Sequence, residues 1–181
     1  MSEAPSYIGL LNRISVAESN AECYLDAWAN TTTHPGVRQV ISTVALREGE
    51  HGKAFAKRLC ELGYSVEPQE NPQAAEKMAI AGSTTLSDME KFEKLNLCAE
   101  NPAADEFFSN VFKDAEIDIQ TGGLLGRYIA EERDSGRMLR ACYAELCAEG
   151  NGSTGNGAFD ARLTRIEELL DQLVGTNAKQ K

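Results

Sequence analysis

Apolar residues recur every three or four positions along most of the first 150 residues, which is the spacing of one face of an α-helix. This stripe predicts a first helix from Pro5 to about Ala29 and a second from about Pro35 to Leu62, where Gly63 is a natural terminator. Charged residues interrupt both stripes, at Glu18 in the first and at Glu48 and His51 in the second. The apolar positions of the two stripes are Leu11, Ile14, Ala21, Leu25 and Trp28, then Val37, Ile41, Val44, Phe55 and Leu62.

A polar connection follows the second helix and occupies residues 63–85. It contains a predicted short helix at 73–81 that ends at Gly82. A connection of this length crosses over the bundle, so the next helix runs parallel to the second one. The third helix is predicted over 87–111, with Ser87 and Glu90 at the spacing of a capping box.

Pro102 falls inside that third helix, where a proline removes a backbone hydrogen bond, so the pattern predicts a kink or a restart there. A fourth helix is predicted from about residue 118 to Ala148, with Glu132 on its inner stripe. The expected fold class is therefore all-α: an up-down four-helix bundle with one long crossover between helices two and three.

The pattern changes after residue 149. Residues 150–157, with the sequence GNGSTGNG, are predicted to form a flexible linker between the bundle at 1–149 and an amphipathic tail helix at 158–181. Apolar residues of the tail alternate at four and three, as in a short coiled coil, which predicts a homodimer. An ordinary amphipathic helix that docks on its own bundle fits the same pattern.

Composition narrows the class of function. The chain has 181 residues, 42% of them hydrophobic and 25% charged, with a net charge of -10. An acidic protein is poorly suited to nucleic acid or to an anionic membrane surface, so neither is expected as a partner. The opening segment lacks the layout of a secretion signal, and a cytoplasmic location is expected. The five cysteines are scattered without a CxxC pair, which favours free thiols.

An internal repeat links the two halves of the bundle. The segment AESNA at 17–21 recurs as AENPA at 99–103, which places Glu18 and Glu100 at matching positions. The second and fourth helices also match. We expect the first and third helices each to contribute one inward carboxylate.

In the second and fourth helices, Glu48 aligns with Glu132 and His51 aligns with Ser135. These glutamates lie 30 and 32 residues after the matching glutamates of the preceding helices, so all four carboxylates should lie at similar height. Four inward carboxylates cannot all remain ionised in an apolar core without cations. Two bridged metal ions solve this problem, and carboxylates with imidazole suit iron or manganese.

The motifs AESNAECY and REGEHGKAF resemble those of the ferritin-like superfamily, most closely its rubrerythrin-type branch, over residues 7–146. The resemblance implies a di-iron or di-manganese carboxylate centre. The ligands that it implies are Glu18, Glu48 and His51 for one ion and Glu100 and Glu132 for the other. The sequence departs from the family at Ser135, where a second histidine is expected, and this puts the second ion in doubt.

The resemblance implies an oxidoreductase that reacts with oxygen or peroxide, in the manner of a ferroxidase or peroxidase. No rubredoxin-like cysteine pairs are found in the sequence, so an external electron donor would be required. Two alternatives stay open. A single metal could be held by Glu18, Glu48 and His51. At the second ion, Glu131 and Glu22 are nearby carboxylates that could contribute if the site is rearranged. A degenerate bundle with one or no metal could instead serve as a scaffold through its tail helix.

Overall fold

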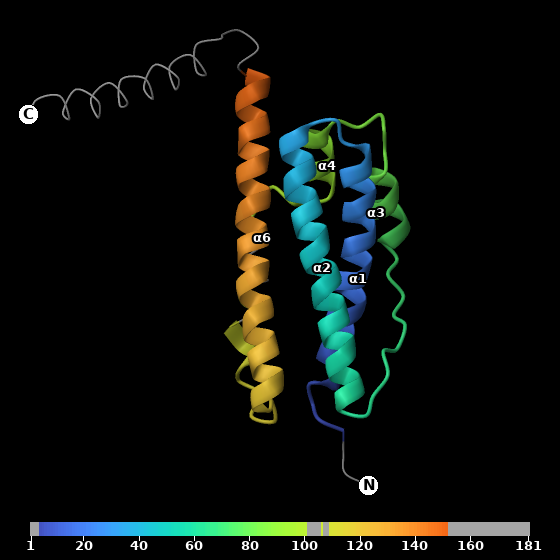
Figure 1. Cartoon of the computed structure of the whole chain (residues 1–181), viewed down its shortest axis with the longest axis vertical. Coiled ribbons are helices and arrows are strands. Elements are labelled where there is room, and N and C mark those ends of the chain that lie inside the picture. The colour runs from blue at the N-terminus through green and yellow to red at the C-terminus, as the bar shows by residue number, and fades with distance from the viewer. Residues whose placement is uncertain (1–3, 101–105, 107–108, 152–181) are drawn as a thin grey trace, which may run out of the picture. The chain divides into compact units, whose positions relative to one another are not determined.

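The computed structural model describes residues 4–100, 106 and 109–151, and every regular element among them is a helix. The elements are α1 (Ile8–Thr31), α2 (Pro35–Glu61), α3 (Ala74–Ala81), α4 (Asp88–Lys94) and α6 (Ile119–Asn151) (Figure 1). The expected all-α class is confirmed for these residues. No described helix has both the length and the apolar character that crossing a membrane requires.

The chain divides into two compact units, residues 1–143 and 144–181, and the fold and site described below belong to the first. In the second unit, residues 144–151 are helical. The first two residues of the predicted linker, 150 and 151, are therefore helical. The rest of that linker and the predicted tail helix at 158–181 lie outside the described residues, so the expected homodimer stays a prediction.

The ends of α2 form as the sequence predicts. At its start, the His34 side chain accepts a hydrogen bond from the Val37 backbone N–H at 3.2 Å. At its end, Gly63 has a φ of +85°, and the backbone N–H of Tyr64 bonds back to the Leu59 carbonyl at 2.9 Å. Glycine adopts this left-handed conformation without steric cost, so the chain leaves the helix at this point.

The third predicted helix is interrupted. Ser87 and Glu90 form the predicted capping box at its start, but α4 ends at Lys94, and helical residues are described again only at 106 and 109–111. Asn96 has a φ of 56°, and the backbone N–H of Leu97 bonds to the carbonyl five residues earlier at 2.9 Å. Asparagine tolerates the left-handed conformation, so this turn ends the helix before Pro102 is reached. Pro102 itself lies outside the described residues.

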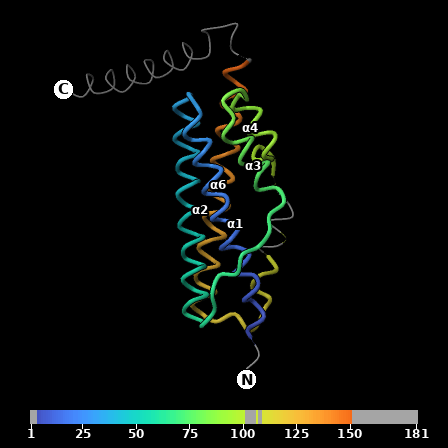
Figure 2. The backbone as a smooth tube through the Cα atoms, turned by 90° about the vertical axis from the view of Figure 1, so that its right-hand side faces the viewer, coloured from blue at the N-terminus to red at the C-terminus, as the bar shows by residue number. Residues whose placement is uncertain are grey.

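Helices α1 and α2 run antiparallel and side by side, and α3 and α4 lie against the C-terminal half of α1 (Figures 1 and 2). Trp28 of α1 is fully buried and meets Phe92 of α4 edge to face, with ring centroids 4.7 Å apart. Toward the start of α1, residues of α1, α2 and α6 share one apolar cluster. Its fully buried members are Leu11, Phe55, Leu59 and Leu125.

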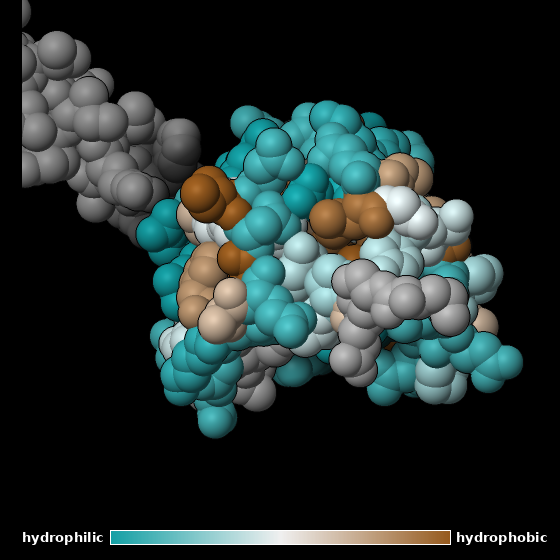
Figure 3. Space-filling model, turned by 90° about the horizontal axis from the view of Figure 1, so that it is seen from below, coloured by the Kyte–Doolittle hydropathy of each residue, from teal (hydrophilic) through white to brown (hydrophobic). Residues whose placement is uncertain are grey.

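A polar network joins the start of α6 to α2 at the lower end of the molecule. The Arg58 guanidinium donates to both carboxylate oxygens of Asp118 at 2.9 Å, and the Tyr7 hydroxyl donates to the same carboxylate at 2.7 Å. Asp118 also accepts from the Thr121 backbone N–H at 3.0 Å, which caps the first turn of α6. Viewed from this end, the surface is mostly hydrophilic, with small separate apolar groups (Figure 3).

The two long helices of the hairpin approach each other closely at Gly52. The Ser15 hydroxyl donates to the Gly52 carbonyl at 3.0 Å. A Cβ on Gly52 would lie 2.6 Å from the Ser19 hydroxyl and 3.1 Å from the Ser19 backbone nitrogen. Because backbone cannot move aside as a side chain can, α1 would have to shift.

We therefore expect Gly52→Ala to lower the free energy of unfolding by about 1–3 kcal/mol, even after the gain in helix propensity. Gly49→Ala is the matched control, since its Cβ would meet only the Glu22 carboxylate, the end of a flexible side chain. That change should be neutral or stabilising. Urea unfolding of the two variants makes the comparison, and equal effects would contradict the close approach at Gly52.

Candidate metal centre

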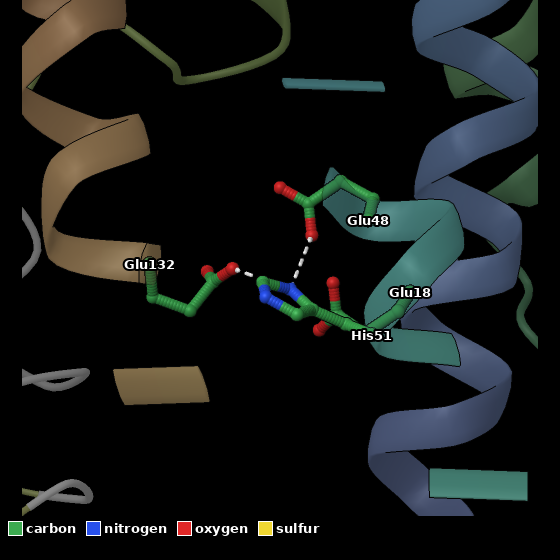
Figure 4. Close-up of side chains that lie close together, drawn as sticks. All are labelled: Glu18, Glu48, His51 and Glu132. Atoms are coloured by element: carbon green, nitrogen blue, oxygen red, sulfur yellow. Dashed lines mark ion pairs between the residues drawn. The ribbon is translucent and has the colours of Figure 1, made fainter. Parts of the chain in front are cut away.

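Four ionisable side chains from three helices converge in the middle of the first unit (Figure 4). Glu18 comes from α1, Glu48 and His51 from successive turns of α2, and Glu132 from α6. Each offers one ligand atom, and these atoms lie within 4.8 Å of one another. Glu18, Glu48 and His51 are 7%, 6% and 4% exposed, so the cluster is largely shielded from water. A metal ion could be held here. The sequence predicted all four as metal ligands, but it assigned Glu132 to a second ion together with Glu100.

Three atoms of the cluster are buried and have no hydrogen-bond partner among the described residues: Glu48 Oε2, His51 Nδ1 and Glu132 Oε1. The His51 Nδ1 atom lies 3.7 Å from Glu48 Oε2 and 3.5 Å from Glu132 Oε1. Buried polar atoms are normally paired, because an unmet one costs about 1–3 kcal/mol. Three such atoms facing one point therefore fit a cation between them.

Two further contacts orient the cluster from outside. The other ring nitrogen of His51, Nε2, lies 2.8 Å from Glu131 Oε2. Glu131 in turn accepts from Arg127 Nε at 2.9 Å. A carboxylate at Nε2 favours the proton on that nitrogen, which leaves Nδ1 to face the cluster when the ring is neutral. The Tyr128 hydroxyl donates to Glu18 Oε1 at 2.9 Å and holds that carboxyl in place.

The electrostatics of Glu18 and Glu48 differ although both are buried. Burial, with the neighbouring Glu48 and Glu132 carboxylates, raises the pKa of Glu18 to about 10. Burial also disfavours ionised Glu48, but the nearby His51 and Glu18 side chains outweigh burial and hold the pKa of Glu48 below its usual value. Without metal at neutral pH, Glu18 is therefore a neutral acid beside an ionised Glu48.

His51 supplies the positive charge of the metal-free cluster. Burial lowers its pKa, but the nearby Glu132, Glu48 and Glu131 carboxylates more than reverse this and raise the pKa to about 10. Burial raises the pKa of Glu132, and the nearby His51 partly offsets this rise. Protons on His51 and Glu18 thus perform the charge compensation that a metal ion would provide.

Glu100 lies outside this cluster. It is exposed, in the non-helical segment that follows α4, because that helix ends early. Glu100 nevertheless lines the same cavity of about 660 Å³ as Glu18, Glu48 and Glu132. Tyr24 of α1 lines it too, and burial and the nearby carboxylates raise the pKa of its hydroxyl.

The remaining position of the repeat, Ser135, is 3% exposed and also lines the cavity. Its hydroxyl accepts from the Arg47 guanidinium at 3.3 Å. Sequence reasoning did not identify Arg47, and it treated Glu131 only as a spare ligand. The sequence did contain a signal for both. Arg47 immediately precedes Glu48, and Glu131 immediately precedes Glu132. Because Glu48 and Glu132 occupy equivalent positions in the repeat, the residues before them are expected to be equivalent too.

Comparison with known proteins adds no assignment to this geometry. No protein-family model matches the chain, and neither the curated proteins nor the solved structures yield a significant match. What identifies the site is the buried arrangement of Glu18, Glu48, His51 and Glu132, which could hold a metal ion.

Proposed function

We propose that the protein binds iron or manganese between Glu18, Glu48, His51 and Glu132 and uses it in redox chemistry with oxygen or peroxide. One observation carries the proposal: three buried ligand atoms of this cluster have no hydrogen-bond partner among the described residues. Carboxylate oxygens and one imidazole nitrogen form a donor set that suits these two metals. Either metal, when bound, supplies electron transfer by changing its oxidation state.

The surrounding residues support this role. Glu131 orients the His51 ring, with the nitrogen Nε2 held at 2.8 Å and Nδ1 turned toward the carboxylates. The Tyr128 hydroxyl donates to Glu18 at 2.9 Å and fixes that carboxyl. The cavity above the cluster gives a small oxidant access to the carboxylates. Electrons would come from a separate donor protein, because the sequence contains no CxxC pair for a redox metal of its own.

We also propose the finer fold, a ferritin-like up-down bundle with one long crossover between its second and third helices. The antiparallel α1–α2 pair, the extended connection after Tyr64 and the ligand on α6 support it. In this bundle the third helix would not be continuous, because α4 ends at Lys94.

Metal analysis tests the proposed site. Protein purified without chelators should carry iron or manganese, and Glu48→Gln should reduce the bound metal at least tenfold, because it removes a charged ligand from a desolvated site. Glu22→Gln is the matched control. Glu22 is also on α1 and near α2, but it pairs with Lys53 at 3.1 Å instead of joining the cluster.

Stopped-flow oxidation of added ferrous iron by oxygen or peroxide then tests the redox role. Fast oxidation that Glu48→Gln abolishes and Glu22→Gln preserves would support it. Wild-type protein that holds less than half an equivalent of any transition metal would overturn the metal site and favour the scaffold alternative. Tight metal binding without any oxidation would overturn only the redox role.

A further inference from the structure

The structure extends the internal repeat to a pair of contacts that cross between α2 and α6. On each helix, the residue just before the repeat glutamate reaches the residue three positions after the glutamate of the other helix. Glu131 contacts His51 at 2.8 Å, and Arg47 contacts Ser135 at 3.3 Å. The two contacts are therefore equivalent in position but differ in chemistry. In the first, a carboxylate contacts an imidazole, and in the second, a guanidinium contacts a hydroxyl.

The first contact suits a metal ligand. An imidazole backed by a carboxylate is neutral when a metal displaces its proton, and the backing increases its basicity. The second contact has the opposite character. A guanidinium is positively charged at all relevant pH values and offers only donors, so the hydrogen bond from Arg47 uses a lone pair of the Ser135 hydroxyl. A hydroxyl in this state is a poor metal ligand.

Arg47 is also held in place on that side of the cluster. Its guanidinium pairs with Asp134 at 2.8 Å and contacts the Met138 sulfur at 3.7 Å, both on α6. Ser135 is 3% exposed, and the Arg47 side chain beside it is 27% exposed. Asp134 offsets part of the Arg47 charge, and the guanidinium that these contacts hold against Ser135 opposes a second cation there.

No other described carboxylate completes the second half of the centre. Asp134, the acid nearest to Ser135 in sequence, is engaged by Arg47 and by Arg137 at 2.7 Å. Glu100, the expected ligand from the third helix, is exposed and lies outside the cluster. Within the described part of the chain, the buried side-chain atoms without a hydrogen-bond partner belong to Glu48, His51 and Glu132, and none belongs to Ser135 or Asp134.

We propose that the centre holds one metal ion, and that the Arg47–Ser135 pair excludes a second. This inference rests on the proposed metal site and specifies its stoichiometry. In this proposal Arg47 is a positioning residue. Its guanidinium, which donates to Ser135, confines a cation to the half of the site that contains His51. The ion is bound by the carboxylates and His51, and the other half of the repeat remains free of metal.

Manganese binding to the wild-type chain provides the first test. Titration with Mn²⁺, followed by calorimetry and by electron paramagnetic resonance, should show one equivalent with the spectrum of an isolated ion. Two equivalents, or the spectrum of a coupled pair, would overturn the inference without touching the metal site. Absence of binding would overturn the proposed function and this inference with it. The wild-type measurement does not depend on whether any variant folds.

A double variant tests the role of the pair. Arg47→Glu with Ser135→His rebuilds the Glu131–His51 contact in the second half, and it should raise the bound Mn²⁺ from one equivalent to two. Ser135→His alone should stay at one, because the Arg47 charge is still present. If the double variant folds, by circular dichroism, and still binds one equivalent, Arg47 and Ser135 are not what excludes the second ion. If the single variant binds two, Arg47 has no part in it.

Discussion

The affinity of the cluster for Mn²⁺ should increase by roughly a hundredfold for each pH unit between about pH 6 and pH 8. Burial and neighbouring carboxylates raise the pKa of Glu18 to about 10, and three carboxylates raise the pKa of His51, against burial, to about 10. Both groups therefore hold a proton throughout this range in the metal-free protein. Each must release it to bind a cation, and each released proton contributes a factor of ten per pH unit.

Competition with a chelator of known pH dependence measures this slope, and calorimetry in two buffers of different ionisation enthalpy counts the released protons directly. Glu18→Gln removes one of the two protons, so its slope should decrease to roughly tenfold per pH unit even though binding is weaker. Glu22→Gln, outside the cluster, should retain the full slope. An affinity that does not change with pH would show that the ligands are already deprotonated.

The second large effect concerns the metal-free protein, in which protonated His51 is the cation that compensates Glu48 and Glu132. His51→Ala should lower the free energy of unfolding at pH 7 by about 3–5 kcal/mol, because removing one partner leaves buried charge uncompensated. Glu18→Gln should change it by less than about 1 kcal/mol, since a neutral amide replaces a carboxyl that is already neutral. Urea unfolding after treatment with a chelator measures both.

The pH dependence of this stability has a definite sign. The pKa of His51 is raised from its unfolded value of 6.5 to about 10 in the folded protein. Its contribution to stability is therefore fully present below about pH 6.5 and is lost as the pH rises through about 10. Metal-free wild-type protein should accordingly become less stable above neutral pH, a trend that His51→Ala removes. Equal stability of His51→Ala and wild-type protein at pH 7 would refute the compensating role of His51.

Much of the fold could be predicted from local pattern. The stripes of apolar residues and the terminator Gly63 predicted the two long helices of the hairpin, and both formed close to their expected limits. Periodicity also placed Glu48 and His51 on one face, because residues three apart in a helix must project together. The repeat added Glu132 from a distant helix, and the structure places it beside them.

The third helix shows where pattern was insufficient. Apolar spacing continued past Lys94, yet the left-handed turn at Asn96 ended the helix and left Glu100 exposed. A stripe of apolar residues shows which side chains favour burial, but it does not show where the backbone turns. One asparagine in the left-handed conformation can end a helix at little conformational cost. The expected ligand Glu100 therefore lay on a helix that the backbone did not continue.

The sequence by itself determined which residues share a helical face, since that depends only on the geometry of one helix. It thereby determined that Glu18, Glu48, His51 and Glu132 would point inward. Only the tertiary structure decided which atoms meet, because contacts across helices depend on how their side chains pack. It placed Glu131 behind His51 and Arg47 against Ser135, and so gave one half of the repeat an imidazole that contacts a carboxylate and the other half a hydroxyl that accepts from a guanidinium.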